Sequence, residues 1–304
     1  MIELALVSGF AAATVRVATP LALAALGETV SERGGVLNLG IEGAMLAGAL
    51  GAAVGAVSFG AAGGVAAGVL AGVATSAIVA AVAIGARADQ IITGTAVTLG
   101  VTGLTGLIAR IAFGNAGAGL TVPTMAAVPI PGLSAIPLIG PAFFSQSLLS
   151  YAVYVLVPAV AWLLFRTRFG LELRAAGESP TAAQAMGVRM GRVRTIGTLL
   201  GGAFAGLAGA SLVLAQVGTF TEKMTAGRGF IAIAIVVLGR WHPLGAALAA
   251  LLFGAATALQ FTFQASGSAV PYQLFLALPY LLALAVLAVA VGRRKGPAGL
   301  GRNR

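Results

Sequence analysis

Long apolar runs recur along this chain of 304 residues, and they constrain its fold more than any other feature of the sequence. An α-helix of about 20 apolar residues is long enough to cross the roughly 30 Å hydrocarbon layer of a membrane. Only 9% of the residues are charged, against about a quarter in an ordinary soluble domain. The apolar runs lie at about 4–27, 38–57, 60–85, 91–113, 148–165, 195–216, 229–239, 243–263 and 272–291.

These runs predict an all-α, polytopic transmembrane bundle of about nine spans, with eight or ten as alternatives, in a single domain over residues 1–304. The run at 229–239 is short for a full span, so we expect a broken or re-entrant helix there. Aromatic residues make up only 7% of the chain, which favours closely packed helices over a lipid-facing β-barrel. The N-terminal run follows no basic region and no cleavage motif, so we interpret it as a span and not as a signal peptide.

One segment, residues 166–194, interrupts the apolar pattern. It holds six of the 18 Lys and Arg residues and two of the eight acidic residues. Because Lys and Arg gather on the cytoplasmic side of membrane proteins, we expect this segment to be cytoplasmic. The same alternation puts 14 of the 18 basic residues and the C-terminus inside the cell. The uncharged, proline-rich connection 114–147 then lies at the outer face, where it forms a surface loop, lies along the membrane surface or covers a cavity mouth.

A short helix is predicted within the cytoplasmic segment. Ser179 suits a helix N-cap, Pro180 suits the first helical position, and Gly187 supplies a C-terminal stop. A solvated connector with a chance helix is the alternative. The small side chains of this helix would let the groove of a partner close around it: Ala182, Ala183 and Ala185.

Few side chains in the sequence could support catalysis. There is no cysteine, the single histidine is His242, and the single aspartate, Asp89, lies in a distant segment. No phosphate-binding G-x-x-x-x-G-K-[ST] motif is present, so ATP would have to bind another chain. These features argue against an enzyme and against a metal site. The net charge of +10 reflects membrane orientation and does not indicate nucleic-acid binding.

Three polar residues inside predicted spans are candidates for the transport pathway or for a helix break. Asn38 and Glu42 share one helix face, just after the Gly34–Gly35 pair. A carboxylate in a span faces a bundle interior or a wet cavity, or accepts hydrogen bonds at a broken helix end, and both roles stay open for Glu42. Arg16 could face the pathway or pair with Glu42. Arg110 lies near an outer helix end, where its guanidinium can reach the interface.

Three blocks of sequence carry a resemblance to a known family: SERGGVLNLGIEGAML (31–46), RAAGESPTAAQAMGV (174–188) and GFIAIAIVVLGRWHPLGAALAALLFG (229–254). In this order they resemble the permease subunits of ABC importers for branched-chain amino acids, simple sugars and nucleosides, and the first block is most similar to permeases for purine nucleosides. The resemblance implies that the second block is a coupling segment that inserts into a groove of a cytoplasmic ATPase. The implied coupling positions are Gly177, Glu178, Ser179, Pro180, Ala183, Met186 and Gly187.

The resemblance also implies a complex in the cytoplasmic (inner) membrane. We expect a second permease subunit, homologous or identical, a cytoplasmic ABC ATPase that binds ATP and Mg, and an extracytoplasmic substrate-binding protein. The chain itself is expected to hold no cofactor. Nucleosides are the expected cargo, with ribose or another simple sugar as the alternative. An ion-coupled secondary transporter that uses Glu42 and Arg16 is the alternative of another class.

Overall fold

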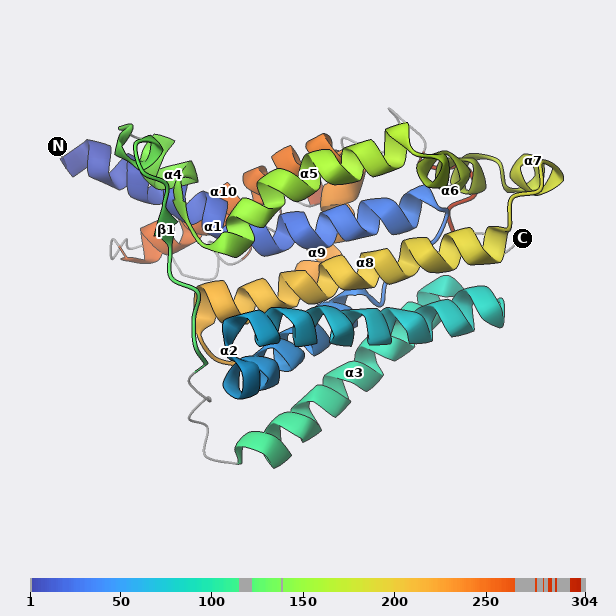
Figure 1. Cartoon of the computed structure of the whole chain (residues 1–304), viewed down its shortest axis with the longest axis horizontal. Helices are drawn as coiled ribbons and strands as arrows, with labels where there is room; N and C mark the ends of the chain where they lie inside the picture. The colour runs from blue at the N-terminus through green and yellow to red at the C-terminus, as the bar shows by residue number, and fades with distance from the viewer. Residues whose placement is uncertain are drawn as a thin grey trace.

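The computed structural model describes residues 2–114, 122–137, 139–265 and 296–301, together with positions 277, 281, 284, 285 and 288. The described residues form a bundle of helices that run between two ends (Figure 1). One end carries α6 (Arg168–Glu178) and α7 (Pro180–Ala185), and we call it the α7 end. The opposite end carries α4 (Ile139–Phe143), and we call it the α4 end.

Six helices in the described part of the chain are long and apolar enough to cross a membrane, so the expected nine spans are not confirmed. The predicted run 272–291 lies outside the described residues, apart from the five single positions given above. The six are α1 (Ile2–Arg33), α2 (Ile41–Val79) with its π-helical continuation η1 (Ala80–Gly85), α3 (Gln90–Phe113), α5 (Leu148–Arg166), α8 (Met190–Leu212) with its π-helical continuation η3 (Val213–Val217), and α10 (Pro243–Ala265).

The second of these helices, α2, is a hairpin. Its backbone leaves the helical region at Phe59 and Gly60, where φ is −131° and +71°. Beyond this point the chain folds back, because Gly55 lies against Gly64 and Gly51 lies against Ala67. The reversal falls between the predicted runs 38–57 and 60–85. Both arms pack on α8 through backbone contacts at glycine, and a Cβ atom at position 209 would overlap the carbonyl oxygen of Met45.

The short run predicted at 229–239 forms the half-length helix α9 (Arg228–Leu238). Its 11 residues rise about 16 Å, roughly half of a hydrocarbon layer. The run therefore has the hydropathy of a span without the length of one. The core packs around α9, α1, α8 and α10, and its side chains have 0–1% of their surface exposed: Leu23, Leu26, Leu212, Ile235 and Phe253.

The connection 114–147, described apart from 115–121 and 138, lies across the α4 end. It contains α4, the 3-10 turn η2 (Leu133–Ala135) and a two-stranded antiparallel pair that the all-α expectation did not include, β1 (Val128–Pro129) with β2 (Ser145–Gln146). Its first part is tied to α8, since the backbone N–H of Met125 donates to the carbonyl of Leu214 at 2.7 Å. A π-helix leaves carbonyl groups available for such bonds.

Candidate functional site

The short helix predicted in the polar segment is present as α7, which projects from the bundle at its end (Figure 1). Pro180 is its first residue, as expected, and Gly187, with φ +83°, ends it. The N–H of Val188 donates back to the carbonyl of Ala183 at 3.0 Å, which closes the last turn. The expected Ser179 cap is wrong in one respect: its side chain makes no capping hydrogen bond, and only its carbonyl accepts from Ala183.

The alanine side chains of α7 do not form one continuous contact surface. Ala183 is 4% exposed and faces the protein, whereas Ala182 and Ala185 are exposed. Met186 is 85% exposed at the C-terminal end of the helix. A partner that docks on α7 would therefore contact Ala182, Ala185 and Met186, and not Ala183. The burial of Ala183 depends on how α7 packs back on the bundle, and an alanine-rich helix carries no sequence signal for that.

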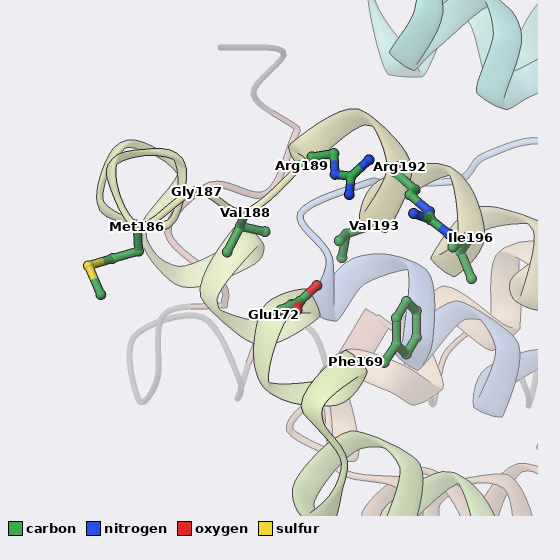
Figure 2. A pocket seen from close by; sticks show the side chains of 9 residues that line it. All are labelled: Phe169, Glu172, Met186, Gly187, Val188, Arg189, Arg192, Val193 and Ile196. Atoms are coloured by element: carbon green, nitrogen blue, oxygen red, sulfur yellow. The ribbon is translucent and has the colours of Figure 1, made fainter.

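A cavity of about 390 Å³ lies beside α7, between α6 and the start of α8 (Figure 2). Phe169 and Val193 form apolar parts of its wall. Glu172 approaches it from α6, while Arg189 and Arg192 approach it from α8. The cavity thus presents a hydrophobic floor with charges of both signs around it, next to the exposed Met186. Such a surface suits a protein partner that brings an apolar side chain and polar flanking groups.

Helix α6 is fastened to the end of α1 at Gly177. A Cβ atom at this position would overlap the carbonyl oxygen of Arg33 and lie 3.1 Å from the backbone nitrogen of Gly35. The carbonyl of Gly177 also accepts from the N–H of Gly299 at 2.7 Å. Only glycine permits this approach of two backbones. Gly177, three residues before the start of α7, is therefore in direct contact with the Gly34–Gly35 turn.

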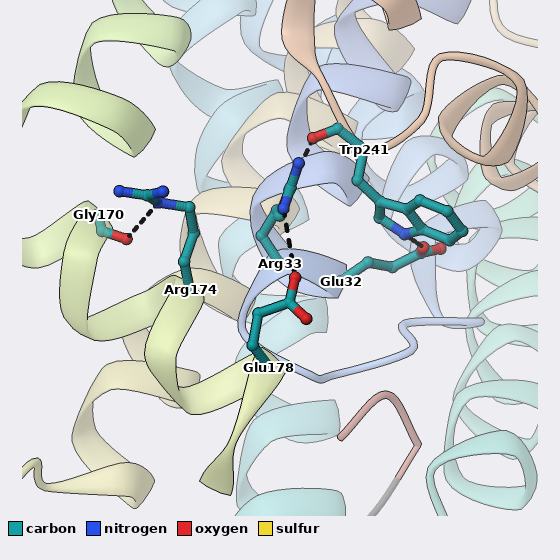
Figure 3. Close-up of polar contacts among 6 residues, drawn as sticks. All are labelled: Glu32, Arg33, Gly170, Arg174, Glu178 and Trp241. Atoms are coloured by element: carbon teal, nitrogen blue, oxygen red, sulfur yellow. Dashed lines mark hydrogen bonds and ion pairs between the residues drawn. The ribbon is translucent and has the colours of Figure 1, made fainter. Parts of the chain in front are cut away.

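Side chains of three segments meet around this contact (Figure 3). The guanidinium of Arg33 donates from Nε to the carbonyl of Trp241 at 2.8 Å, and its Nη1 lies 3.6 Å from Oε1 of Glu178. The indole of Trp241 donates to Oε2 of Glu32. Glu178, at the end of α6, is thus paired with the last residue of α1.

The Gly34–Gly35 turn is also held from α8. Arg194 is 6% exposed and donates from Nε to the carbonyl of Gly34 at 3.1 Å and from Nη2 to the carbonyl of Ala176 at 3.4 Å. One guanidinium therefore bridges the α1 turn and α6. The sequence showed Arg194 only as one of several basic residues in a polar segment. Its bridging role was missed because both acceptors are main-chain carbonyls.

His242, which follows Trp241, stacks on Phe165 with ring centroids 5.0 Å apart. Its Nδ1 accepts from the N–H of Leu244 at 3.3 Å. The guanidinium of Arg174 lies 5.0 Å from the centroid of the same Phe165 ring. His242 thus serves as part of a tight turn between α9 and α10.

A second polar contact lies deep in the bundle, at Glu42. This side chain is 8% exposed, and its Oε1 accepts from the N–H of Gly227 at 2.9 Å while Oε2 accepts from the N–H of Gly229 at 2.6 Å. The carboxylate therefore caps the N-terminus of α9, where unpaired N–H groups and the helix dipole favour negative charge. Of the roles left open for Glu42, the observed contacts are those of an acceptor at a broken helix end. Among the described residues, no ion pair joins it to Arg16.

The other polar candidates lie elsewhere. Asn38 is fully buried, and its backbone N–H donates to Oε1 of Glu28 at 3.0 Å. Arg16 is exposed on α1, and its carbonyl accepts from Gln216 at 2.7 Å. Arg110 pairs with Glu222, an acid that the sequence did not single out, with 2.8 Å between Nε and Oε1. The structure therefore brings none of the three candidates Arg16, Asn38 and Glu42 into hydrogen bonding or ion pairing with each other.

Residues 10–290 of the chain match the protein family described as branched-chain amino acid transport system, permease component. No solved structure matches the chain.

Several curated relatives are similar over nearly the whole length. The guanosine ABC transporter permease protein of Bacillus subtilis is 36% identical, over 95% of this chain and 94% of its own length. A putative glucose ABC transporter permease protein of Haloferax volcanii is 39% identical, over 94% and 92%. The nucleoside ABC transporter permease protein of Lactococcus lactis is 34% identical, over 94% and 93%.

Proposed function

Because this chain belongs to the family of branched-chain amino acid transport system permease components, we propose that it is the membrane-spanning subunit of an ATP-driven importer of nucleosides. Family membership and the six apolar helices carry the assignment as a multi-pass permease. The nucleoside cargo is supported by the two relatives whose names specify guanosine and nucleosides. The chain supplies the route through the membrane and no catalytic group.

We propose that the α7 end is cytoplasmic and docks an ABC ATPase, which would bind ATP and Mg in its own chain. The basic residues of α6, α8 and the neighbouring turns gather at this end, as the positive-inside rule expects. The projecting α7, the exposed Met186 and the adjoining cavity form the docking surface. A second permease subunit and an extracytoplasmic binding protein, which would deliver cargo at the α4 end, complete the proposed importer.

Replacing the exposed Ala182 by arginine should uncouple transport from ATP hydrolysis. A long charged side chain on the docking face of α7 would keep the ATPase groove from closing, and a coupling free energy of about 1–3 kcal/mol corresponds to a loss of uptake on the order of tenfold. Uptake of labelled guanosine and ATPase activity are measured in the reconstituted complex. Ala86→Arg is the matched control, because Ala86 is exposed in the turn before α3 and away from α7. Equal uptake by Ala182→Arg and Ala86→Arg would show that α7 is not part of the docking surface.

The glucose relative from Haloferax volcanii, at 39% identity, supports a sugar as the alternative cargo. Competition separates the two cargoes. In cells that carry the importer, unlabelled guanosine should suppress the uptake of labelled guanosine, while ribose and glucose at the same concentration should leave it unchanged. Saturable uptake of ribose or glucose without uptake of any nucleoside would assign the importer to sugars.

A further inference from the structure

The segment 219–228, between η3 and α9, is polar in a chain that is otherwise apolar. Six of its ten residues are Thr, Glu, Lys or Arg. Phe220 and Thr225 are buried and anchor the segment in the protein, while Thr221, Glu222 and Lys223 are exposed. The segment thus has a buried side and an exposed polar side.

The end of this segment lies at membrane depth. The turn after α9 is bonded to Arg33 at the α7 end, and α9 rises about 16 Å from that turn. Gly227, at the start of α9, is therefore near the middle of the bundle, where Glu42 holds it. The other end of the segment follows η3 at the α4 end, where the carbonyl of Gly218 accepts from Val122. Residues 219–227 therefore run, without a regular helix, from the α4 end to the middle of the bundle.

Non-helical backbone at this depth occurs in membrane proteins only where protein buries it or water reaches it. Thr221, Glu222 and Lys223 are exposed and lie nearer the α4 end, since Glu222 pairs with Arg110 in the last turn of α3, and the segment continues from them to Gly227 in the bundle. The backbone is also held in a defined shape. Lys223 and Ala226 adopt left-handed φ values of 58° and 46°, which non-glycine residues rarely do. Exposed polar side chains on a non-helical segment that enters the bundle are typical of a segment that lines an aqueous cavity.

The acidic residue on this surface, Glu222, is paired with a basic residue of α3. Arg110 of α3 donates to Glu222 from Nε at 2.8 Å and from Nη2 at 3.2 Å. Two hydrogen bonds thus join the guanidinium and the carboxylate. Hydroxyl groups stand beside it, and the Oγ1 of Thr219 is buried with no hydrogen-bond partner among the described residues. The exposed hydroxyl of Thr221 and ammonium of Lys223, on either side of Glu222 in the chain, suit a solute that carries several hydroxyl groups.

From this geometry we propose that residues 219–228 form a water-facing wall of the translocation pathway, along which the exposed Thr221 and Lys223 hydrogen-bond a polyhydroxyl solute such as a nucleoside. The inference rests on the proposed function for the identity of the solute. The presence of water along this wall is inferred without the proposed function.

The absence of cysteine from the sequence makes a direct test possible. Thr221→Cys and Lys223→Cys are each made in the full chain, assembled with its partners, and treated from the outer side with a charged, membrane-impermeant thiosulfonate. Leu107→Cys is the matched control, because Leu107 is 56% exposed on α3, next to the Gly106 that faces Glu222. Only the thiolate reacts, and each unit by which an apolar environment raises the thiol pKa slows labelling about tenfold.

Cysteines at positions 221 and 223 should react at least about tenfold faster than the cysteine at position 107. Their modification should block uptake, and guanosine should slow the labelling. Unreactive cysteines at 221 and 223, in a complex that still transports, would overturn the proposal, as would labelling that leaves uptake unchanged. Rapid labelling that ribose slows and guanosine does not, in a complex that imports no nucleoside, would support the wall and refute the nucleoside cargo.

Discussion

Replacing Gly177 by valine should abolish coupled uptake and lower the yield of folded protein. Its first side-chain carbon would overlap the carbonyl oxygen of Arg33, and that atom belongs to a backbone that cannot rotate away. Either α6 or the Gly34–Gly35 turn must move, which for an overpacked site costs about 1–3 kcal/mol. The movement would also strain the Arg33–Glu178 pair, whose partners are 3.6 Å apart. Thermal unfolding in detergent and guanosine uptake in the reconstituted complex measure the two effects.

Gly191→Ala is the control for this substitution. Gly191 lies in the first turn of α8 at the same end of the bundle, and a Cβ atom there would meet nothing within 4 Å. Alanine favours a helix over glycine by up to about 1 kcal/mol, so stability should stay equal or rise. Wild-type stability and uptake in Gly177→Val would mean that the contact between α6 and the α1 turn is dispensable.

Replacing Glu42 by alanine should destabilise the bundle from its centre. The N–H groups of Gly227 and Gly229 would lose their acceptor in a buried place. An unsatisfied buried donor costs about 1–3 kcal/mol, and the start of α9 would also lose a favourable negative charge. We expect a lower apparent Tm in detergent and a loss of transport, since residues 219–227 depend on this anchor for their position.

Two further variants separate the loss of the cap from the loss of an acid. Glu42→Gln keeps one oxygen acceptor and should recover part of the lost Tm. Glu172→Ala removes an exposed acid on α6 and should leave the Tm unchanged. A Tm for Glu42→Ala equal to that of the wild type would show that α9 does not need this cap.

Local rules predicted the short helix and its ends well, because Pro180 and Gly187 act through their own backbone geometry. They did not predict which side of α7 is buried, since that depends on packing against the bundle. The hydrogen-bond partner of Glu42 could not be predicted from the sequence either, because Gly227 is 185 residues away in the chain. A carboxylate in a span indicates an unusual environment, yet the main-chain donors that satisfy it have no side-chain signature.

The span count shows a different limit. Hydropathy reports the length of an apolar run, and a run of 11 residues such as α9 has the composition of a span without crossing the layer. The prediction correctly identified this run as short. The described residues contain six long helices and not nine for three reasons: α9 is short, 272–291 lies largely outside the described part, and the runs 38–57 and 60–85 are joined in α2 and η1. The boundary predicted between the runs 38–57 and 60–85 coincides with the chain reversal at Phe59 and Gly60.

The Gly34–Gly35 turn determines how many residues separate α7 from the buried Glu42 site. Gly177 and Arg194 both contact this turn, and Glu42 follows Gly34 eight residues later in the sequence. A displacement of α6 would thus reach the α9 cap along a connection of only eight residues. In the proposed importer, a displacement of about 1 Å at the ATPase would then move the start of α9, which Glu42 holds, by a similar amount.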